Sequence, residues 1–416
     1  MRRCRPEERE HGEENLAHGG REGNGRRLVI PFDRERLHRL MRTHNTSVIL
    51  ATTRQNVRYL TGGYYLPFYA RTPRFGASQY LPIVAIPAEN PGAAFYVGRQ
   101  DSILNELDYI EVFGPLWISN RHWIQRSPSM SAAAAEKAVQ VLRSQGLTGG
   151  TIGIESSFLP ADAFETLRSG LPEAAFVNAT PLLAELRAVK RPAEVEQLRQ
   201  VHHLTAEAVR AVLTEGRPEQ TTQQIATSVQ RRIEERGASF LYAFTNVGPG
   251  LLRAPSGERW GRRRPLHVDA GAEFNEYEAD IARMGSIGAP PSLALDLFTA
   301  CLDAQEQIRG AISAGLPCRD LWRIGTETMA RGRWGQYGRF LAHGLGMVNH
   351  EPPEVSERSH GSLEASMILS VETEYLHPEA GHIKIEDTIV VTPTGCEGLG
   401  DVDREWCVVP DVDPRA

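Results

Sequence analysis

The alternation of apolar and polar positions divides the chain into helical and extended segments that begin after residue 27. Apolar residues at three- and four-residue spacing predict a helix over 32–41, and an alanine-rich stretch predicts another over 132–145. Short apolar runs predict strands at 47–51, 81–86, 94–97 and 151–155. Strands that alternate with helices favour an α/β domain over residues 28–178.

The remaining residues, 179–416, combine longer helices with β-rich segments. Pro192, followed by Glu194, predicts a helix start, and Gly237 predicts the end of a helix over 222–236. Further helices are expected at 292–314 and 319–330. Extended segments are expected on both sides of a turn near Asn275, then at 367–371 and 388–391. The fold class is therefore α/β (α+β), with a second, mixed domain in this half.

Composition bounds the possibilities further. At 416 residues the chain exceeds the usual size of one domain, and its 41% hydrophobic content suits a globular protein. A net charge of -6 gives no reason to expect nucleic acid or an anionic membrane as partner. Five scattered cysteines without a C-x-x-C pair predict reduced thiols and a cytoplasmic location. Residues 1–27 are charged and nearly devoid of apolar side chains, so a disordered arm is expected there.

Five side chains in the second half carry the candidate chemistry. Two aspartates lie eleven positions apart, and one histidine and two glutamates follow on apolar-flanked segments: Asp269, Asp280, His343, Glu372 and Glu386. Four carboxylates balance the charge of two divalent cations. Hard oxygen ligands with one imidazole suit Mn, Fe, Co or Zn. The pattern predicts a site for two such ions.

The order of these motifs resembles the creatinase, prolidase and aminopeptidase P metallopeptidases. That family has an aspartate pair, then His-Gly-x-Gly, His-Glu-x-Pro, a Glu near Pro-Gly, and Arg-x-Glu-Asp. This chain has matching segments at Asp269 and Asp280, at 343–346, at 350–353, at Glu372 and at 384–387. The stretch 56–62 is similar to the family's amino-terminal domain.

The resemblance implies a creatinase-like amino-terminal domain followed by a pita-bread catalytic domain. It also implies Xaa-Pro aminopeptidase or dipeptidase activity on a short peptide or small molecule, and a homodimer. Two divalent ions are implied, manganese first, with Co, Zn or Fe as alternatives. Hydroxide would attack the scissile carbonyl, Glu372 would carry the proton, and His350 would hydrogen-bond the oxyanion.

Three residues mark departures from the family pattern. Relatives have a histidine near position 253, where this chain has Arg253, which favours a substrate carboxylate. Glu374 replaces the glycine of Glu-Pro-Gly and adds a carboxylate that could bind a cationic group. Lys384 replaces arginine and faces the same way as Glu386 by alternation, so it is a further candidate for substrate binding. His377 and His382 flank a turn and are expected at the surface.

The departures leave two alternatives open. One is a specialised small-molecule hydrolase or lyase, because creatinase-like and C–S lyase relatives share the fold. The other is a non-catalytic binding protein. The complete ligand set argues against the second alternative.

Overall fold

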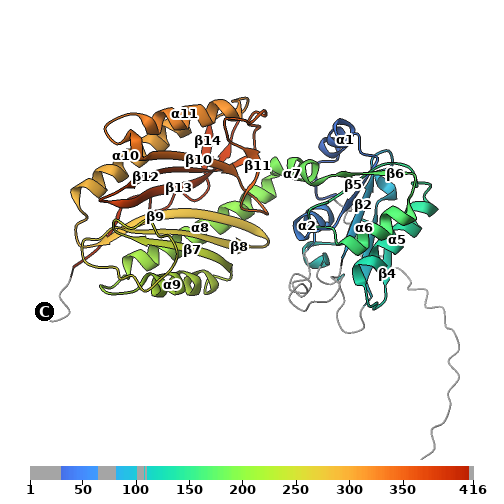
Figure 1. Cartoon of the computed structure of the whole chain (residues 1–416), viewed down its shortest axis with the longest axis horizontal. Helices are drawn as coiled ribbons and strands as arrows, with labels where there is room; N and C mark the ends of the chain where they lie inside the picture. The colour runs from blue at the N-terminus through green and yellow to red at the C-terminus, as the bar shows by residue number, and fades with distance from the viewer. Residues whose placement is uncertain (1–29, 64–80, 101–106, 108–109, 412–416) are drawn as a thin grey trace, which may run out of the picture.

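The computed structural model describes residues 30–411 except 64–80, 101–106 and 108–109, and it has two domains joined through helix α7 (Thr180–Ala188) (Figure 1). The amino-terminal domain is built on a six-stranded sheet with the order β4-β3-β2-β1-β5-β6. Its strands are β1 (Val48–Ala51), β2 (Ile83–Pro87), β3 (Phe95–Arg99), β4 (Asn120–Ile124), β5 (Gly150–Ile154) and β6 (Ala174–Asn178). Its main helices are α1 (Arg34–Thr43), α2 (Arg54–Thr61), α5 (Met130–Ser144) and α6 (Ala161–Gly170).

The carboxyl-terminal domain contains one large sheet with the order β11-β10-β12-β13-β9-β8-β7, to which β14 and β15 add at β13 and β9. The strands are β7 (Ser239–Val247), β8 (Leu266–Phe274), β9 (Tyr277–Ile287), β10 (Gly338–Gly344), β11 (Glu351–Glu354), β12 (Ile368–His377), β13 (Gly381–Val391), β14 (Cys396–Gly398) and β15 (Cys407–Val409). Asn275 and Glu276 both have positive φ and close the β8–β9 hairpin, as in tight two-residue hairpin turns.

Four helices pack against this sheet in two pairs: α8 (Pro192–Thr214) and α9 (Thr222–Glu234) against β7–β9, and α10 (Ser292–Ala311) and α11 (Cys318–Ala330) against β10, β12 and β13. In Figure 1, α10 and α11 lie above the strands and α9 lies below them. Alternate residues of each strand supply the apolar contacts to the helices, among them Val268 and Ala270 on β8 and Val371 on β12. Because side chains alternate along a strand, the residues between them face the opposite side. The polar candidates Asp269 and Glu372 are therefore presented away from the helices.

A chain of buried polar side chains connects the two domains. The Glu155 carboxylate accepts hydrogen bonds from the backbone of Thr53 at 2.8 Å and from Asn56 Nδ2 at 2.6 Å. Asn56 Oδ1 in turn accepts from Arg187 of α7. Arg187 Nε then donates to Glu351 Oε2 at 3.0 Å, beside His350. The amino-terminal domain is thus bonded to the segment that carries a candidate catalytic residue.

The structure confirms most predicted elements with shifts of one to three residues at their ends, but the strands expected at 367–371 and 388–391 are longer and span 368–377 and 381–391. The helix expected over 32–41 spans 34–43, and the helix expected over 292–314 ends at Ala311. Pro192 begins α8 as predicted, and the Glu194 side chain accepts a bond from the Arg191 backbone. The predicted arm, 1–27, lies outside the described residues. Among the described helices, none combines the length and apolar character needed to cross a bilayer.

Candidate metal centre

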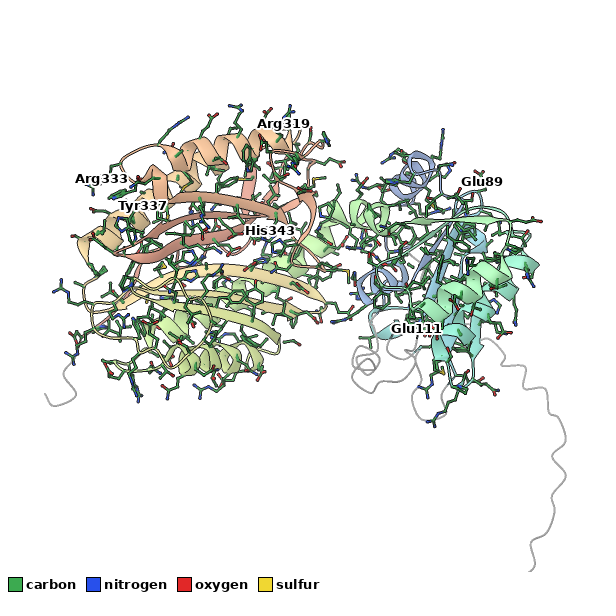
Figure 2. The ribbon with its side chains drawn as sticks, viewed as in Figure 1. Glu89, Glu111, Arg319, Arg333, Tyr337 and His343 are labelled. Atoms are coloured by element: carbon green, nitrogen blue, oxygen red, sulfur yellow. The ribbon has the colours of Figure 1, made fainter. Side chains whose placement is uncertain are left out.

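The five predicted ligands lie on five strands of the sheet, on the face opposite the helices. Glu372 and Glu386 are direct cross-strand partners, and Ser370, two residues before Glu372, pairs with His343. Asp269 lies opposite Ala282, two residues along β9 from Asp280. His343 lies toward the end of the domain that faces α7 (Figure 2). Each of the five is less than a tenth exposed: Asp269, Asp280, His343, Glu372 and Glu386.

Three of these residues converge on one point. Asp280, His343 and Glu386 each offer a ligand atom, and the three atoms lie within 4.8 Å of one another. His343 Nε2 is also 3.5 Å from Glu372 Oε1. Within the described part of the chain, buried Asp280 Oδ1 and His343 Nε2 find no hydrogen-bond partner. Buried polar atoms are normally satisfied, so these two fit a role as metal ligands.

Two cationic side chains contact the same carboxylates. Lys384 Nζ lies 2.9 Å from Asp269 Oδ2, 2.6 Å from Glu372 Oε2 and 2.8 Å from Glu386 Oε2. Arg253 Nη2 lies 2.5 Å from Asp269 Oδ2. The sequence placed both cations among the substrate-binding residues. The structure instead brings Lys384 into the centre of the ligand set, where it is 3% exposed.

The pKa values of the acids reflect this crowding. Burial, followed by the charge of Asp269, raises the pKa of Asp280 to about 6. Burial and the neighbouring carboxylate of Asp280 raise the pKa of Glu386 well above its usual value. Burial acts on Glu372 in the same direction, but Lys384 and His343 outweigh it and lower the pKa of Glu372. Like charges held this close in a buried site favour the binding of a cation.

His350 lies beside the ligands as the sequence suggested. Its ring stacks on that of His343 with centroids 3.8 Å apart and an interplanar angle of 22°. Partial burial, together with the neighbouring His343, lowers the pKa of His350. Since it is solvent-exposed on one side, the ring can reach a substrate. This position suits a hydrogen-bond donor next to the metal ligands.

Glu374 lies beyond Glu372 on the same face, but its carboxylate already has a partner. His382 Nε2 lies 2.5 Å from Glu374 Oε2, and the His382 ring packs on His267 with centroids 4.4 Å apart. The prediction that His377 and His382 lie at the surface is wrong, since they are 9% and 3% exposed. The turn between them packs closely against the loop after β7. The approach is so close that a Cβ added at Gly381 would lie 1.7 Å from the Gly248 carbonyl oxygen.

Several supporting residues were not found by sequence reasoning. Asn349 Nδ2 donates to Asp280 Oδ2 at 3.1 Å and to Tyr242 Oη at 2.9 Å. Ser370 Oγ donates to Glu386 Oε1 at 2.7 Å. Ser370 could have been found from alternation, because it lies two residues before Glu372 on one strand. Asn349 lies in a loop, where no period predicts its direction.

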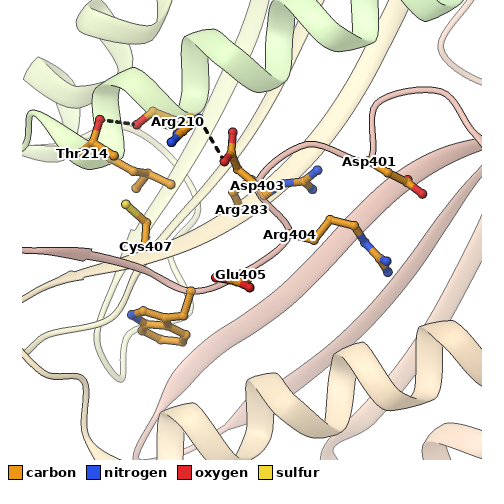
Figure 3. A pocket seen from close by; sticks show the side chains of 10 residues that line it. Arg210, Thr214, Arg283, Asp401, Asp403, Arg404, Glu405 and Cys407 are labelled. Atoms are coloured by element: carbon orange, nitrogen blue, oxygen red, sulfur yellow. Dashed lines mark hydrogen bonds and ion pairs between the residues drawn. The ribbon is translucent and has the colours of Figure 1, made fainter.

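A cavity of about 530 Å³ lies on the other side of β9, and none of the five predicted ligands lines it (Figure 3). It lies between α8 and residues 401–407, and Arg210 pairs with Asp403 across it at 3.2 Å. Arg283 lines it and donates to the Glu386 carbonyl oxygen at 2.8 Å and to Asp387 Oδ1 at 2.7 Å. Arg283 therefore holds the backbone that carries one predicted ligand, Glu386.

Comparisons with known proteins agree with the motifs. The family description "Metallopeptidase family M24" matches residues 196–393, and "Creatinase/Prolidase N-terminal domain" matches residues 34–189. The chain is 27% identical over 264 residues to an Xaa-Pro dipeptidase of Pyrococcus horikoshii, covering 61% of this chain and 74% of that protein. It is 24% identical over 381 residues to an uncharacterized peptidase of Bacillus subtilis, covering 90% and 99%.

Solved structures show the same fold over nearly the whole chain. An Xaa-Pro dipeptidase from Bacillus anthracis superposes with a TM-score of 0.75 at 20% identity, covering 90% of this chain and 99% of that one. A dipeptidase from Pyrococcus horikoshii gives a TM-score of 0.76 at 20% identity with the same coverage. Both expected domains, creatinase-like and pita-bread, are therefore confirmed. The chain belongs to the creatinase, prolidase and aminopeptidase P family of pita-bread metallopeptidases.

Proposed function

We propose that this protein is a metal-dependent peptidase that hydrolyses the peptide bond of Xaa-Pro dipeptides. The observation that carries the proposal is the convergence of Asp280, His343 and Glu386 on one point, with Asp269 and Glu372 beside them. Two named relatives, from Pyrococcus horikoshii and Pyrococcus furiosus, are Xaa-Pro dipeptidases. Manganese is the first candidate metal, because the ligands are hard oxygens with one imidazole.

The chemistry divides between the ion and the protein. A bound divalent ion polarises the scissile carbonyl and lowers the pKa of water. Glu372 stays ionised beside Lys384 and His343, so it can accept the proton of the attacking water and pass it to the leaving amine. His350 donates a hydrogen bond to the oxygen on which negative charge develops. The result is cleavage of a C–N bond.

Arg253 is proposed to bind the carboxylate end of the substrate. Its side chain is 41% exposed and uses Nη2 on Asp269, which leaves most of its five N–H donors free for a ligand. A guanidinium forms paired hydrogen bonds to a carboxylate. Glu374 and Lys384 are assigned to the support of the site, since His382 and the ligand carboxylates occupy them. A dipeptide has the free carboxylate that this arrangement requires.

A homodimer in the cytoplasm is also proposed. The dimer is proposed from the resemblance to the creatinase and prolidase family. The location is supported by the four described cysteines, which are all free. Free thiols are typical of reducing compartments.

The test is hydrolysis of Xaa-Pro dipeptides by protein reconstituted with Mn, Co, Zn or Fe. Turnover and bound metal that are both lost in Asp280→Ala would support the proposal. Asp303→Ala, an exposed position on α10, is the matched control and should keep both. Bound metal without turnover on any Xaa-Pro dipeptide would refute the proposed substrate.

A specialised small-molecule hydrolase is the second candidate. The observation that favours it is the replacement of the family's histidine by Arg253 and of its glycine by Glu374. Both replacements change the surroundings of the substrate without removing a ligand. Turnover of a non-peptide amide that carries a carboxylate, without turnover of dipeptides, would favour this candidate.

A further inference from the structure

Lys384 differs in its surroundings from the other cationic side chains that the structure describes. Its side chain is 3% exposed, and it forms ion pairs with three predicted metal ligands: Asp269, Glu372 and Glu386. An ammonium has three N–H donors and no acceptor. Three carboxylate oxygens at 2.6–2.9 Å therefore use its full capacity.

The backbone fixes this arrangement. Lys384 lies two residues before Glu386 on β13, so both side chains emerge on the same face. Its cross-strand partner, Glu374, is occupied by His382 at 2.5 Å and is not free to take the ammonium. If a metal ion displaced Lys384 from its three carboxylates, a buried charge would remain without equivalent partners. Burial of an unpaired charge is strongly unfavourable.

The five ligands consequently fall into two groups. Asp280, His343 and Glu386 have ligand atoms that lie within 4.8 Å of one another. Asp269 and Glu372 contact Lys384 at 2.9 Å and 2.6 Å, and the other oxygen of Glu372 lies farther away, 3.5 Å from His343 Nε2. A carboxylate has two oxygens, which allows Glu386 to belong to both groups.

The charge balance of the site favours a single divalent ion. The four carboxylates carry four negative charges when ionised. Lys384 and Arg253 contact these carboxylates and neutralise two of the charges. A single divalent ion neutralises the other two, whereas two divalent ions would leave an excess of positive charge in a buried site.

We propose that the Lys384 ammonium takes the place of a second metal ion, so that each chain binds one divalent ion, at Asp280, His343 and Glu386. This inference rests on the proposed metal-dependent function and refines the sequence-based expectation of two ions. Relatives have an arginine at this position, and the planar guanidinium differs in shape from a compact ammonium.

The number of bound ions tests the inference directly. Metal-free protein is equilibrated with Mn²⁺, and bound manganese per chain is measured by dialysis and elemental analysis. Wild-type protein should bind one Mn²⁺ and show the electron paramagnetic resonance spectrum of an isolated ion. Lys384→Met should bind two ions and show the spectrum of a coupled pair. Lys137→Met, on the amino-terminal helix α5, is the control and should bind one.

Two equivalent ions in the wild-type protein would overturn the inference, and this outcome does not require any variant to fold. A single ion in folded Lys384→Met would overturn it as well. Parallel assays with an Xaa-Pro dipeptide separate the two proposals. Two ions with turnover would leave the proposed function intact and remove the role of Lys384. One ion without turnover would support the role of Lys384 and refute the substrate.

Discussion

Glu351→Gln should destabilise the protein more than other charge-removing substitutions, because Glu351 lies between two buried cations. Its Oε2 accepts from Arg187 Nε at 3.0 Å, and its Oε1 accepts from Lys190 Nζ at 2.7 Å. The three side chains are 5% exposed or less. Glutamine keeps the shape but directs an amide NH₂ at one of the cations.

The size of the effect follows from this burial. Removing one partner of a buried ion pair costs about 3–5 kcal/mol, against a typical total stability of about 5–15 kcal/mol. Glu397→Gln is the matched control. Glu397 pairs with Arg199 at 2.8 Å, but the two side chains are 60% and 36% exposed, so about 1 kcal/mol or less is expected.

Urea unfolding followed by tryptophan fluorescence measures both variants against the wild type. The midpoint of Glu351→Gln should fall clearly below that of Glu397→Gln. Equal midpoints would refute the account of the buried network. Because Glu351 directly follows His350, kcat should also fall in Glu351→Gln while bound metal stays at the wild-type level.

Three further predictions test other parts of the structure. Arg253→Met should raise KM for dipeptides with a free carboxylate by about 10- to 100-fold, measured against the corresponding carboxamides, because a charge-assisted bond contributes about 1.5–3 kcal/mol. Burial lowers the pKa of His202 from 6.5 to about 4. The stability that the folded protein gains from holding this imidazole neutral is therefore fully present above pH 6.5 and is lost as the pH falls toward 4. The total loss is about 3 kcal/mol, and unfolding curves of His202→Leu should show a smaller loss over the same range. Gly381→Ala should lower stability by more than about 2 kcal/mol, because φ is +83° and the added Cβ would collide with backbone. Gly361→Ala, which has open space, should be near neutral in the same unfolding assay.

Local patterns were sufficient for the elements that position the site. Alternation placed Lys384 and Glu386 on one face, and the turn at Asn275 placed the two aspartates on adjacent strands. Asp269 and Asp280 could be predicted as ligands because both lie in one continuous segment, at a spacing that the sequence shows directly. These features depend on neighbours within a few residues, which a sequence displays directly.

Contacts between distant segments were beyond the sequence pattern. Arg187 and Glu351 lie 164 positions apart, and nothing in either segment specifies the other. His382 was assigned to the surface because it follows a turn, but that turn packs under the loop at Gly248. The direction of Lys384 was predictable, whereas its three partners depend on how β8, β12 and β13 come together.

The β12–β13 hairpin also has a consequence for how this protein can change in evolution. Glu372 and Glu386 are cross-strand partners, and three residues connect His377 to Gly381. A shift of one position in this pairing would turn Glu386 toward the helices and bring Ile385 into the site. Single-residue deletions at this distant turn should therefore be selected against as strongly as the loss of a ligand. Lineages can vary the composition of the turn, but its length is constrained by the chemistry at the other end of the hairpin.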